Sequence, residues 1–423
     1  MVIASIDIQS GAVVQLRQGT ELALRREDGL ALAREFDRYG EVAVIDLDAA
    51  MGRGSNLEMI KPLLRAAECR VGGGIRDADQ AAELVSLGAA KVIVGSAAFR
   101  GASGFAVNEG FLDALARAVG RERVIVAVDA RGGELVMDGW RTPTGLALVE
   151  TAKRVEEYAG ELLYTSVERE GMMAGADLAT IRELRGAVSC LVTAAGGVST
   201  LDEIAAIAGA GCDVQLGMAL YTGKIGLADA FAASLNWGKA SDGLLPLIAQ
   251  SADGQVLMTG FTGREALLET FRRGNVCFHS RTRGKLWMKG ESSGNTLGLL
   301  RVRADCDRDA LLAVVEPRGP TCHTGAWSCF ETGRRYTLQH LQRIIDGRLR
   351  DKPAGSYTAS LTDERVRRKV MEEAYEVCTA KTRDEIVWEA ADLLYHTAVL
   401  LSREGVSVDD VLLELDRRGK SPR

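Results

Sequence analysis

The first half of the sequence predicts a (β/α)8 barrel, because short apolar runs alternate with helical segments and the pattern repeats itself. Eight runs rich in β-branched residues lie within residues 1–238, and amphipathic segments such as ADQAAELVSLG separate most of them. This alternation over about 240 residues is typical of a parallel barrel surrounded by helices. The runs are VIASIDI, EVAVIDLD, CRVGGG, AKVIVG, RVIVAVDA, ELLYTSV, CLVTAAGG and CDVQLG.

The repeat predicts that the barrel consists of two similar halves. Asp7 in SIDI recurs as Asp129 in AVDA, at a separation of about 120 residues. The segments GGIRDADQAAELVSLG and GGVSTLDEIAAIAGAG align at nearly the same separation. A repeat of this length implies a duplicated half-barrel.

Two changes of composition divide the rest of the chain. The polar stretch 234–242 is suited to a linker. Residues 243–330 contain strand-like runs and turns, which predicts a small mixed α+β domain. Residues 336–419 consist almost wholly of helical patterns, which predicts an all-α domain. The chain is therefore expected to contain three domains.

Composition excludes several classes of protein. Of the 423 residues, 47% are apolar and 26% are charged, which argues against wholesale disorder. The net charge of −6 provides no general attraction for nucleic acid. No apolar run approaches the length of a membrane span, and the first residues lack the pattern of a secretory signal. Eight cysteines are too sparse for a disulfide framework, so we expect a cytoplasmic protein.

Two aspartates are the first candidate catalytic residues. In a (β/α)8 barrel the chemistry lies at the carboxyl ends of the strands. Asp7 and Asp129 end the first and fifth predicted strands, on opposite sides of the barrel mouth. Two facing carboxylates suit paired general acid and base catalysis. Thr165 ends the sixth strand, where its hydroxyl can hold a substrate or assist proton transfer.

Glycine-rich loops follow four other strands and predict two phosphate sites. Free backbone N–H groups at helix N-termini bind phosphate well, and two such sites imply a substrate with a phosphate at each end. Alternatively, the glycines form tight turns and the aspartates cap helices; the symmetry of the set favours function. The candidate residues are Gly73, Gly74, Gly95, Ser96, Gly196, Gly197, Gly217 and Met218.

Residues 1–235 resemble the phosphoribosylformimino-aminoimidazole carboxamide ribotide isomerases of histidine biosynthesis. The matching motifs are VVQLRQG, VGGGIRD, VDARGGELVMDGW, YTSVEREG, AAGGVST and LGMALY. The resemblance implies an Amadori rearrangement of a bisphosphorylated aminoaldose, with Asp7 and Asp129 as acid and base, Thr165 assisting and Trp140 stacking on the substrate. Met218 and Glu170 depart from the family, in which a basic residue and an aspartate are usual.

Three alternatives remain open for the barrel. The cyclase subunit of imidazole glycerol phosphate synthase shares the barrel and both aspartates, although VVQLRQG and DARGGELVMDGW are more similar to the isomerase. The barrel can also be a scaffold beside two active domains, a role that loss of an aspartate would favour. The third alternative is a barrel with dual isomerase activity, which also acts on phosphoribosyl anthranilate.

The middle domain contains a cluster of aspartates and cysteines. In an extended DCDRD run, Asp305, Asp307 and Asp309 project to one face, which suits Mg²⁺. Cys306, Cys322 and Cys329 are three thiols, and three thiolates with a water describe a catalytic zinc site. Buried free cysteines beside an acidic turn are the alternative.

Residues 243–330 strongly resemble phosphoribosyl-AMP cyclohydrolase, through SRTRGKLWMKGESSGN, DCDRD and CHTGAWSCF. The resemblance implies hydrolytic opening of the adenine ring between N1 and C6, zinc on the three cysteines and Mg²⁺ on the aspartates. Cys306 would come from the partner subunit, which implies a homodimer. Candidate phosphate contacts are Arg281, Arg283, Lys285 and Lys289, and candidate proton shuttles are His279 and His323.

The helical domain has carboxylates at helical spacing on two segments. Like charges clustered in this way repel one another unless they hold a cation, so the pattern predicts Mg²⁺. A solvated face is the alternative, but the second helix carries so many apolar residues that we expect it to be largely buried. The residues are Glu372, Glu373, Glu376, Glu389 and Asp392.

Residues 336–419 resemble phosphoribosyl-ATP pyrophosphatase, through GSYTASL, KVMEEAYEV and EAADLLYH. The resemblance implies Mg²⁺ on the triphosphate, with Arg368 and Lys369 neutralising phosphate. The three resemblances together imply consecutive steps of one pathway acting on small phosphoribosyl substrates.

Overall fold

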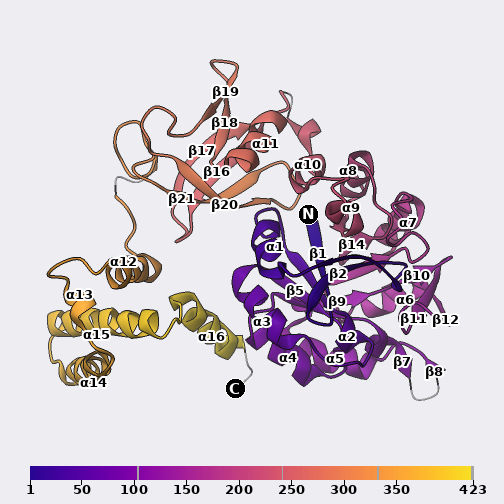
Figure 1. Cartoon of the computed structure of the whole chain (residues 1–423), viewed down its shortest axis with the longest axis horizontal. Helices are drawn as coiled ribbons and strands as arrows, with labels where there is room; N and C mark the ends of the chain where they lie inside the picture. The colour runs from indigo at the N-terminus through magenta and orange to yellow at the C-terminus, as the bar shows by residue number, and fades with distance from the viewer. Residues whose placement is uncertain (102–103, 241, 331–332, 421–423) are drawn as a thin grey trace. The chain divides into compact units, whose positions relative to one another are not determined.

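The computed structural model describes residues 1–423 except 102–103, 241, 331–332 and 421–423, and the chain divides into two compact units (Figure 1). The first unit comprises Met1–Ser251 and Val256–Gly325, and the second comprises Ala252–Gln255 and Ala326–Arg423. The predicted barrel and most of the middle domain therefore lie in the first unit. None of the described helices is long and apolar enough to cross a membrane.

The first unit contains a closed barrel of eight parallel strands, as predicted. Each barrel strand pairs in parallel with both of its neighbours, and β15 pairs with β1 to close the ring. Every strand corresponds to one of the eight apolar runs. The strands are β1 (Val2–Gln9), β4 (Val42–Asp46), β5 (Cys69–Gly72), β6 (Lys91–Val94), β9 (Val124–Ala127), β13 (Glu161–Thr165), β14 (Leu191–Ala195) and β15 (Asp213–Leu216).

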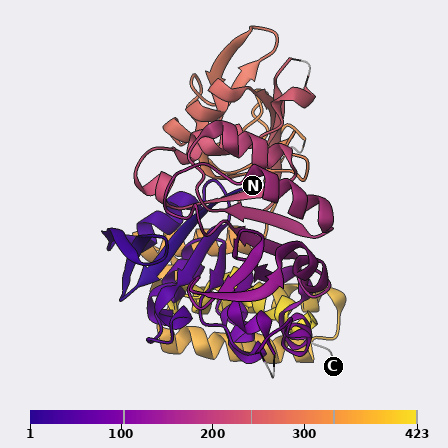
Figure 2. The same cartoon turned by 90° about the vertical axis from the view of Figure 1, so that its right-hand side faces the viewer.

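Helices surround the barrel and pack their apolar faces on its strands (Figures 1 and 2). Two of them show the internal repeat in their caps. Asp77 caps α4 by accepting from Gln80 N, and Thr200 caps α8 in a capping box with Glu203. The outer helices are α1 (Gly29–Phe36), α3 (Leu57–Ala66), α4 (Ala78–Ser86), α5 (Glu109–Val119), α6 (Leu148–Val155), α7 (Leu178–Ala187), α8 (Leu201–Gly209) and α10 (Leu227–Ala233).

Short strands extend the loops at the carboxyl ends of β1 and β9. An antiparallel hairpin of β2 (Ala12–Arg17) and β3 (Glu21–Arg26) continues from β1. The second extension is a separate sheet of β10 (Ala130–Arg131), β11 (Glu134–Met137) and β12 (Thr142–Ala147). Each extension begins shortly after a predicted catalytic aspartate and contributes residues to the barrel mouth.

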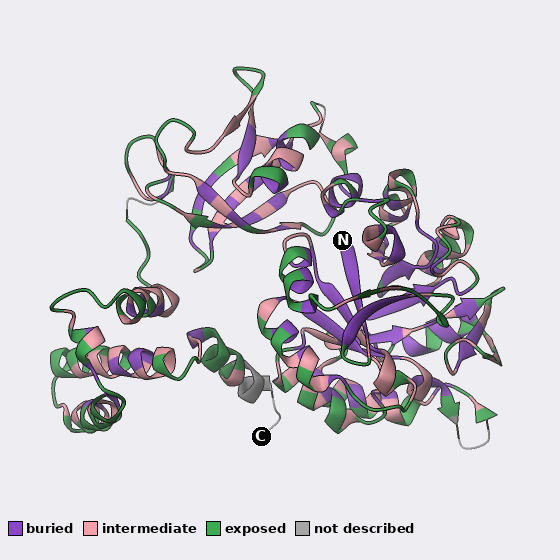
Figure 3. Ribbon diagram, viewed as in Figure 1, coloured by how far each residue is buried: buried purple, intermediate pink, exposed green. Residues whose placement is uncertain are grey.

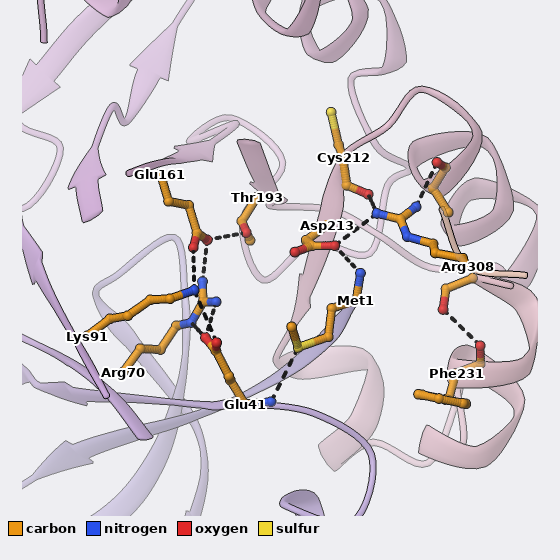
Figure 4. Close-up of polar contacts among 12 residues, drawn as sticks. Met1, Glu41, Arg70, Lys91, Glu161, Thr193, Cys212, Asp213, Phe231 and Arg308 are labelled. Atoms are coloured by element: carbon orange, nitrogen blue, oxygen red, sulfur yellow. Dashed lines mark hydrogen bonds and ion pairs between the residues drawn. The ribbon is translucent and has the colours of Figure 1, made fainter. Parts of the chain in front are cut away.

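A buried ion network lies inside the barrel at the opposite ends of the strands (Figure 4). Arg70 is fully buried and pairs with Glu41 and Glu161, and Lys91 pairs with the same two carboxylates at 3.1 and 3.0 Å. Burial alone would raise the pKa of Glu161, but Arg70 and Lys91 outweigh it and lower that pKa to about 2. The network therefore satisfies the charges within the barrel floor.

The middle part of the chain forms a four-stranded sheet in the order β17-β16-β21-β20. Its strands are β16 (Leu245–Ser251), β17 (Val256–Thr262), β20 (Leu297–Ala304) and β21 (Leu311–Pro317), and a hairpin of β18 (Cys277–Ser280) and β19 (Lys285–Met288) lies between β17 and β20 in the sequence. The mixed α+β fold predicted here is confirmed, and its helix is α11 (Arg264–Arg273), which the strand-like runs in the sequence did not locate. Its buried Ala266, Leu267, Thr270 and Phe271 have helical spacing, a signal that a search for strands overlooks.

The sheet domain packs directly on the barrel within the first unit. The ring of Phe271 lies 4.5 Å from that of Tyr39 and 5.6 Å from that of Phe231. The stretch 234–242, expected to be a linker, is packed at its start: Leu235 is buried, and the indole of Trp237 donates to the carbonyl of Ala232 at 2.7 Å. Apolar side chains within this polar stretch explain the difference.

The second unit consists of helices around a small core of Leu341, Ile345, Leu361, Val366 and Val399 with Ala398. The expectation that the second carboxylate helix is largely buried is wrong, because Trp388 on that helix is 70% exposed. Most of this helix is coloured as exposed or intermediate in Figure 3. Among the described residues, this helix contributes Ala398 and Val399 of its later turns to the small core. The helices are α12 (Leu338–Asp351), α13 (Tyr357–Ser360), α14 (Asp363–Thr379), α15 (Arg383–Arg403) and α16 (Val408–Lys420).

Candidate functional site

A cavity of about 590 Å³ opens at the carboxyl ends of the barrel strands. It gathers side chains from both halves of the repeat, so that residues far apart in the sequence face one space. Every residue predicted for the barrel site lines it. These residues are Asp7, Gly73, Gly74, Gly95, Ser96, Asp129, Trp140, Thr165, Gly196, Gly197, Gly217 and Met218.

Asp129 is held by two donors at the mouth of the barrel. The indole of Trp140 donates to Oδ2 of Asp129 at 2.9 Å, and the hydroxyl of Thr165 also hydrogen bonds to this carboxylate. Burial raises the pKa of Asp129, although both hydrogen bonds favour its charged form. Trp140 has a left-handed backbone conformation (φ 66°). Its ring packs closely on Gly19, because a Cβ added to Gly19 would lie 3.0 Å from the nearest ring carbon.

Asp7 and Glu170 complete a group of three carboxyls. Burial raises the pKa of Asp7 to about 7. Burial and the charges of Asp7 and Asp129 raise the pKa of Glu170 to about 7. At neutral pH each of these two groups is thus present in both protonation states, as acid–base chemistry requires. The sequence marked Glu170 only as a departure from the family, and no spacing signal placed it beside both aspartates.

The paired glycines pack against backbone at equivalent places in the two halves. A Cβ on Gly73 would lie 2.2 Å from the carbonyl oxygen of Asp46, and one on Gly196 would lie 2.6 Å from that of Ser166. Both residues have positive φ, which glycine adopts without strain. The close approach explains why glycine is needed, and it leaves the loop backbone bare toward the cavity.

The remaining loop residues begin short helical turns that line the cavity. Gly95 precedes a 3-10 turn over Ser96–Phe99, and Gly217 precedes α9 (Met218–Tyr221). Met218 lines the cavity with an uncharged side chain, so this position presents no positive charge there. Two arginines that sequence reasoning missed, Arg76 and Arg100, line the cavity instead.

The three aspartates of the middle domain lie together, with carboxylate oxygens within 4.8 Å of one another. The expectation of an extended run is wrong, because residues 305–310 form the turn between β20 and β21. The Oδ1 of Asp305 accepts hydrogen bonds from the backbone N–H groups of Asp309 at 3.0 Å and Ala310 at 3.1 Å, and these bonds order the loop. Arg308 takes a left-handed conformation (φ 63°) in the same turn. Oxygen donors of this kind and number suit a hard divalent cation.

The other candidates of the middle domain are mostly exposed. Arg281 stacks over the ring of Phe261 at 3.7 Å, and Arg283 contacts Ser280 at 3.3 Å. Lys285 is exposed, whereas Lys289 and His279 are half-buried. The Oγ of Thr324 lies 3.1 Å from Sγ of Cys322, next to the exposed His323. Cys306 and Cys322 belong to the first unit and Cys329 to the second, so the zinc site stays a prediction.

The five predicted carboxylates of the helical domain form two overlapping groups that share Glu373. Within each group the carboxylate oxygens lie within 4.8 Å of one another. Glu373 is 3% exposed, and Lys369 donates to its Oε1 at 3.1 Å. Burial, followed by the neighbouring glutamates, raises the pKa of Glu376. The groups are Glu372, Glu373 and Glu376, and Glu373, Glu389 and Asp392.

A buried histidine beside this cluster was not predicted. His396 is 4% exposed, and its Nδ1 lies 3.6 Å from Oε1 of Glu373. Its Nε2 lies 3.2 Å from the hydroxyl of Tyr357. The signal was present in the sequence, because His396 follows Asp392 by four residues and so shares its helix face.

Three family models match the chain in sequence. The model described as "Histidine biosynthesis protein" matches residues 1–226, "Phosphoribosyl-AMP cyclohydrolase" matches 258–331 and "Phosphoribosyl-ATP pyrophosphohydrolase" matches 338–419.

Curated relatives include proteins named histidine biosynthesis bifunctional protein HisIE. The protein of Vibrio vulnificus is 44% identical over 201 residues, which is 45% of this chain and 95% of that protein. That of Pyrococcus furiosus is 41% identical over 201 residues, or 44% of this chain and 96% of that protein. That of Bacillus subtilis is 44% identical over 192 residues, or 42% of this chain and 92% of that protein.

Proposed function

This chain belongs to the family of histidine biosynthesis proteins and is an enzyme, and we propose that it catalyses three consecutive steps of that pathway. The helical domain, 336–419, hydrolyses phosphoribosyl-ATP to phosphoribosyl-AMP and pyrophosphate. The middle domain, 243–330, opens the adenine ring. The barrel, 1–238, isomerises the resulting aminoaldose to the aminoketose.

The observation that carries the barrel step is the meeting of Asp7, Asp129 and Glu170 in one cavity with the glycine loops. An aldose-to-ketose rearrangement needs an acid for the sugar ring oxygen and a base for the proton on the neighbouring carbon. Asp7 and Asp129 supply these roles from opposite sides of the mouth, with Trp140 and Thr165 orienting Asp129. The bare backbone at the paired glycine loops supports two phosphate sites.

The donor sets of the later domains support metal ions. Asp305, Asp307 and Asp309, and separately the helical groups around Glu373, offer only carboxylate oxygens, which suits Mg²⁺. The thiols of Cys306, Cys322 and Cys329 suit zinc, which when bound lowers the pKa of its water to about 7 and so supplies hydroxide. Completion of the thiol set by the partner's cysteine would make the chain a homodimer through this domain.

Incubation of the purified chain with phosphoribosyl-ATP, with every product identified by mass, tests all three steps at once. We expect pyrophosphate and the aminoketose as end products. Accumulation of the aminoaldose would support a barrel that serves only as a scaffold. Conversion of supplied aminoketose with ammonia to an imidazole product would support the cyclase alternative, and turnover of phosphoribosyl anthranilate would show dual activity.

A further inference from the structure

A lysine from the stretch that follows the barrel, Lys239, lies against the acidic loop, defined here as residues 305–309. Nζ of Lys239 pairs with Oδ2 of Asp307 and lies 2.9 Å from Oδ2 of Asp309. Those two carboxylates belong to the set proposed above for Mg²⁺. The ammonium group of Lys239 therefore contacts carboxylate oxygens that a bound divalent cation would also contact.

The contact between Lys239 and the aspartates depends on how the acidic loop packs against the barrel. The guanidinium of Arg308 donates to the carbonyls of Ala208 and Cys212, each at 2.7 Å, and to Asp213 at 2.9 Å. Figure 4 shows Arg308 reaching Asp213, which also pairs with the amino group of Met1. Arg308 is 14% exposed, so its hydrogen bonds are shielded from water. These contacts fix the loop to the outside of the barrel.

The backbone brings the lysine to the same place. The N–H of Asn236 donates to the carbonyl of Arg308 at 2.8 Å, so the segment that leaves the barrel runs beside the acidic loop. The following turn, Trp237–Lys239, is held by the indole hydrogen bond of Trp237. Because both ends of the contact are anchored, the pairing of Lys239 with the aspartates is intramolecular, and its effective concentration is set by the tether and not by the bulk solution.

We infer that Lys239 is a tethered cation that competes with a divalent cation for the carboxylates of the acidic loop. The inference rests on the proposed Mg²⁺ site of the cyclohydrolase domain. A lysine ammonium carries one charge, and its side chain is 45% exposed, so it can be displaced into water. A divalent cation must displace the ammonium of Lys239 from the aspartates before it binds. The affinity of the acidic loop for the divalent cation is lowered by the free energy of that ion pairing.

The test is a titration of the full chain with Mn²⁺, followed by electron paramagnetic resonance. Parent, Lys239→Met and the control Lys61→Met are compared. Lys61 pairs with Glu58 at 2.6 Å elsewhere on the barrel, so its variant loses the same charge and a similar ion pair. Binding that Asp305→Asn abolishes is assigned to the acidic loop, which separates it from the helical groups.

We expect Lys239→Met to bind Mn²⁺ at the loop about five- to twentyfold more tightly than the parent, since two exposed ion pairs no longer compete. Lys239→Arg, which keeps the charge, should resemble the parent, as should Lys61→Met. Equal affinity in Lys239→Met and the parent overturns the inference, and so does weaker binding, which would mean that the lysine shapes the loop for the cation.

Ring-opening activity, measured on the same parent and variant proteins, separates a failure of this inference from a failure of the proposed function on which it rests. If neither the parent nor the variants bind Mn²⁺ at the loop, the competition is overturned. Ring opening of supplied phosphoribosyl-AMP by those preparations would then leave the cyclohydrolase assignment in place, whereas its absence would count against that assignment as well.

Discussion

The indole nitrogen of Trp140 donates a hydrogen bond to Oδ2 of Asp129 at 2.9 Å. This contact ties a residue of the β11–β12 connection to a carboxylate at the end of β9. Together with Thr165 it holds the carboxylate of Asp129, and all three residues line the cavity. The pair therefore joins the carboxylate proposed for proton transfer to an aromatic side chain of the cavity wall.

Asp129→Asn should block isomerisation while the other two steps continue. An asparagine can still accept from Trp140 through its amide oxygen, so the geometry survives, but a carboxamide cannot exchange a proton. General acid–base catalysis typically contributes about 10²–10⁴-fold, and a loss of that size is expected. Mass analysis should show the aminoaldose accumulating. Formation of the aminoketose at the parent rate would refute the barrel assignment. The control is Asp113→Asn, a surface aspartate whose side chain is 50% exposed.

Glu170→Gln should change how the stability of the barrel depends on pH. The folded pKa of Glu170, about 7, lies above its ordinary value of 4.5, so the folded state binds more protons between those pH values. Stability contributed by this group is therefore present below about pH 4.5 and is lost as pH rises to about 7. Glutamine does not titrate, so the variant escapes this loss.

The expected gain of Glu170→Gln over the parent is about 1–2 kcal/mol at pH 8, and it should be small at pH 5. Urea midpoints of the barrel transition at both pH values measure it. The exposed neighbour Glu168→Gln should show no such difference between the two pH values. A Glu170→Gln gain that is the same at pH 5 and pH 8 would argue against a proton held by this carboxyl.

Cys322→Ser should remove about one zinc per chain and stop ring opening. Serine keeps the shape of cysteine but is a poor zinc ligand, because its hydroxyl stays protonated near neutral pH. Phosphoribosyl-AMP should then build up. Metal analysis provides the measurement, with Cys378→Ser as the matched control on an exposed helical cysteine. Full zinc occupancy in Cys322→Ser would rule out the three-cysteine site.

Glu373→Gln should abolish pyrophosphate release but leave activity on supplied phosphoribosyl-AMP. Glu373 belongs to both carboxylate groups, so losing its charge weakens each of them toward Mg²⁺. Glutamine is nearly isosteric, and its amide oxygen can still accept from Lys369. The control is Glu364→Gln in the exposed first turn of the same helix. Parent-like release with a raised thermal midpoint would instead indicate a repelling surface cluster.

The sequence by itself determined the architecture of the barrel and placed the candidate aspartates and glycine loops at its cavity. Strand-length apolar runs and glycine turns are local signals, and parallel strands joined by helices bring their carboxyl ends together in this fold. Asp7 and Asp129 could therefore be placed across one mouth before any coordinates were known. The spacing of Glu372, Glu373 and Glu376 predicted a shared helix face for the same reason, because helical periodicity is local.

Only the tertiary structure decided the contacts that depend on docking between distant segments. Glu170 faces Asp7 and Asp129 because a loop after β13 folds over the barrel mouth, and its raised pKa follows from that position. Lys239 meets Asp307 because Arg308 docks the acidic loop on the barrel. Such pairs join residues that are far apart in the chain. Their burial and the interaction of their charges arise only when the surfaces pack together, so no periodicity or spacing in the sequence predicts them.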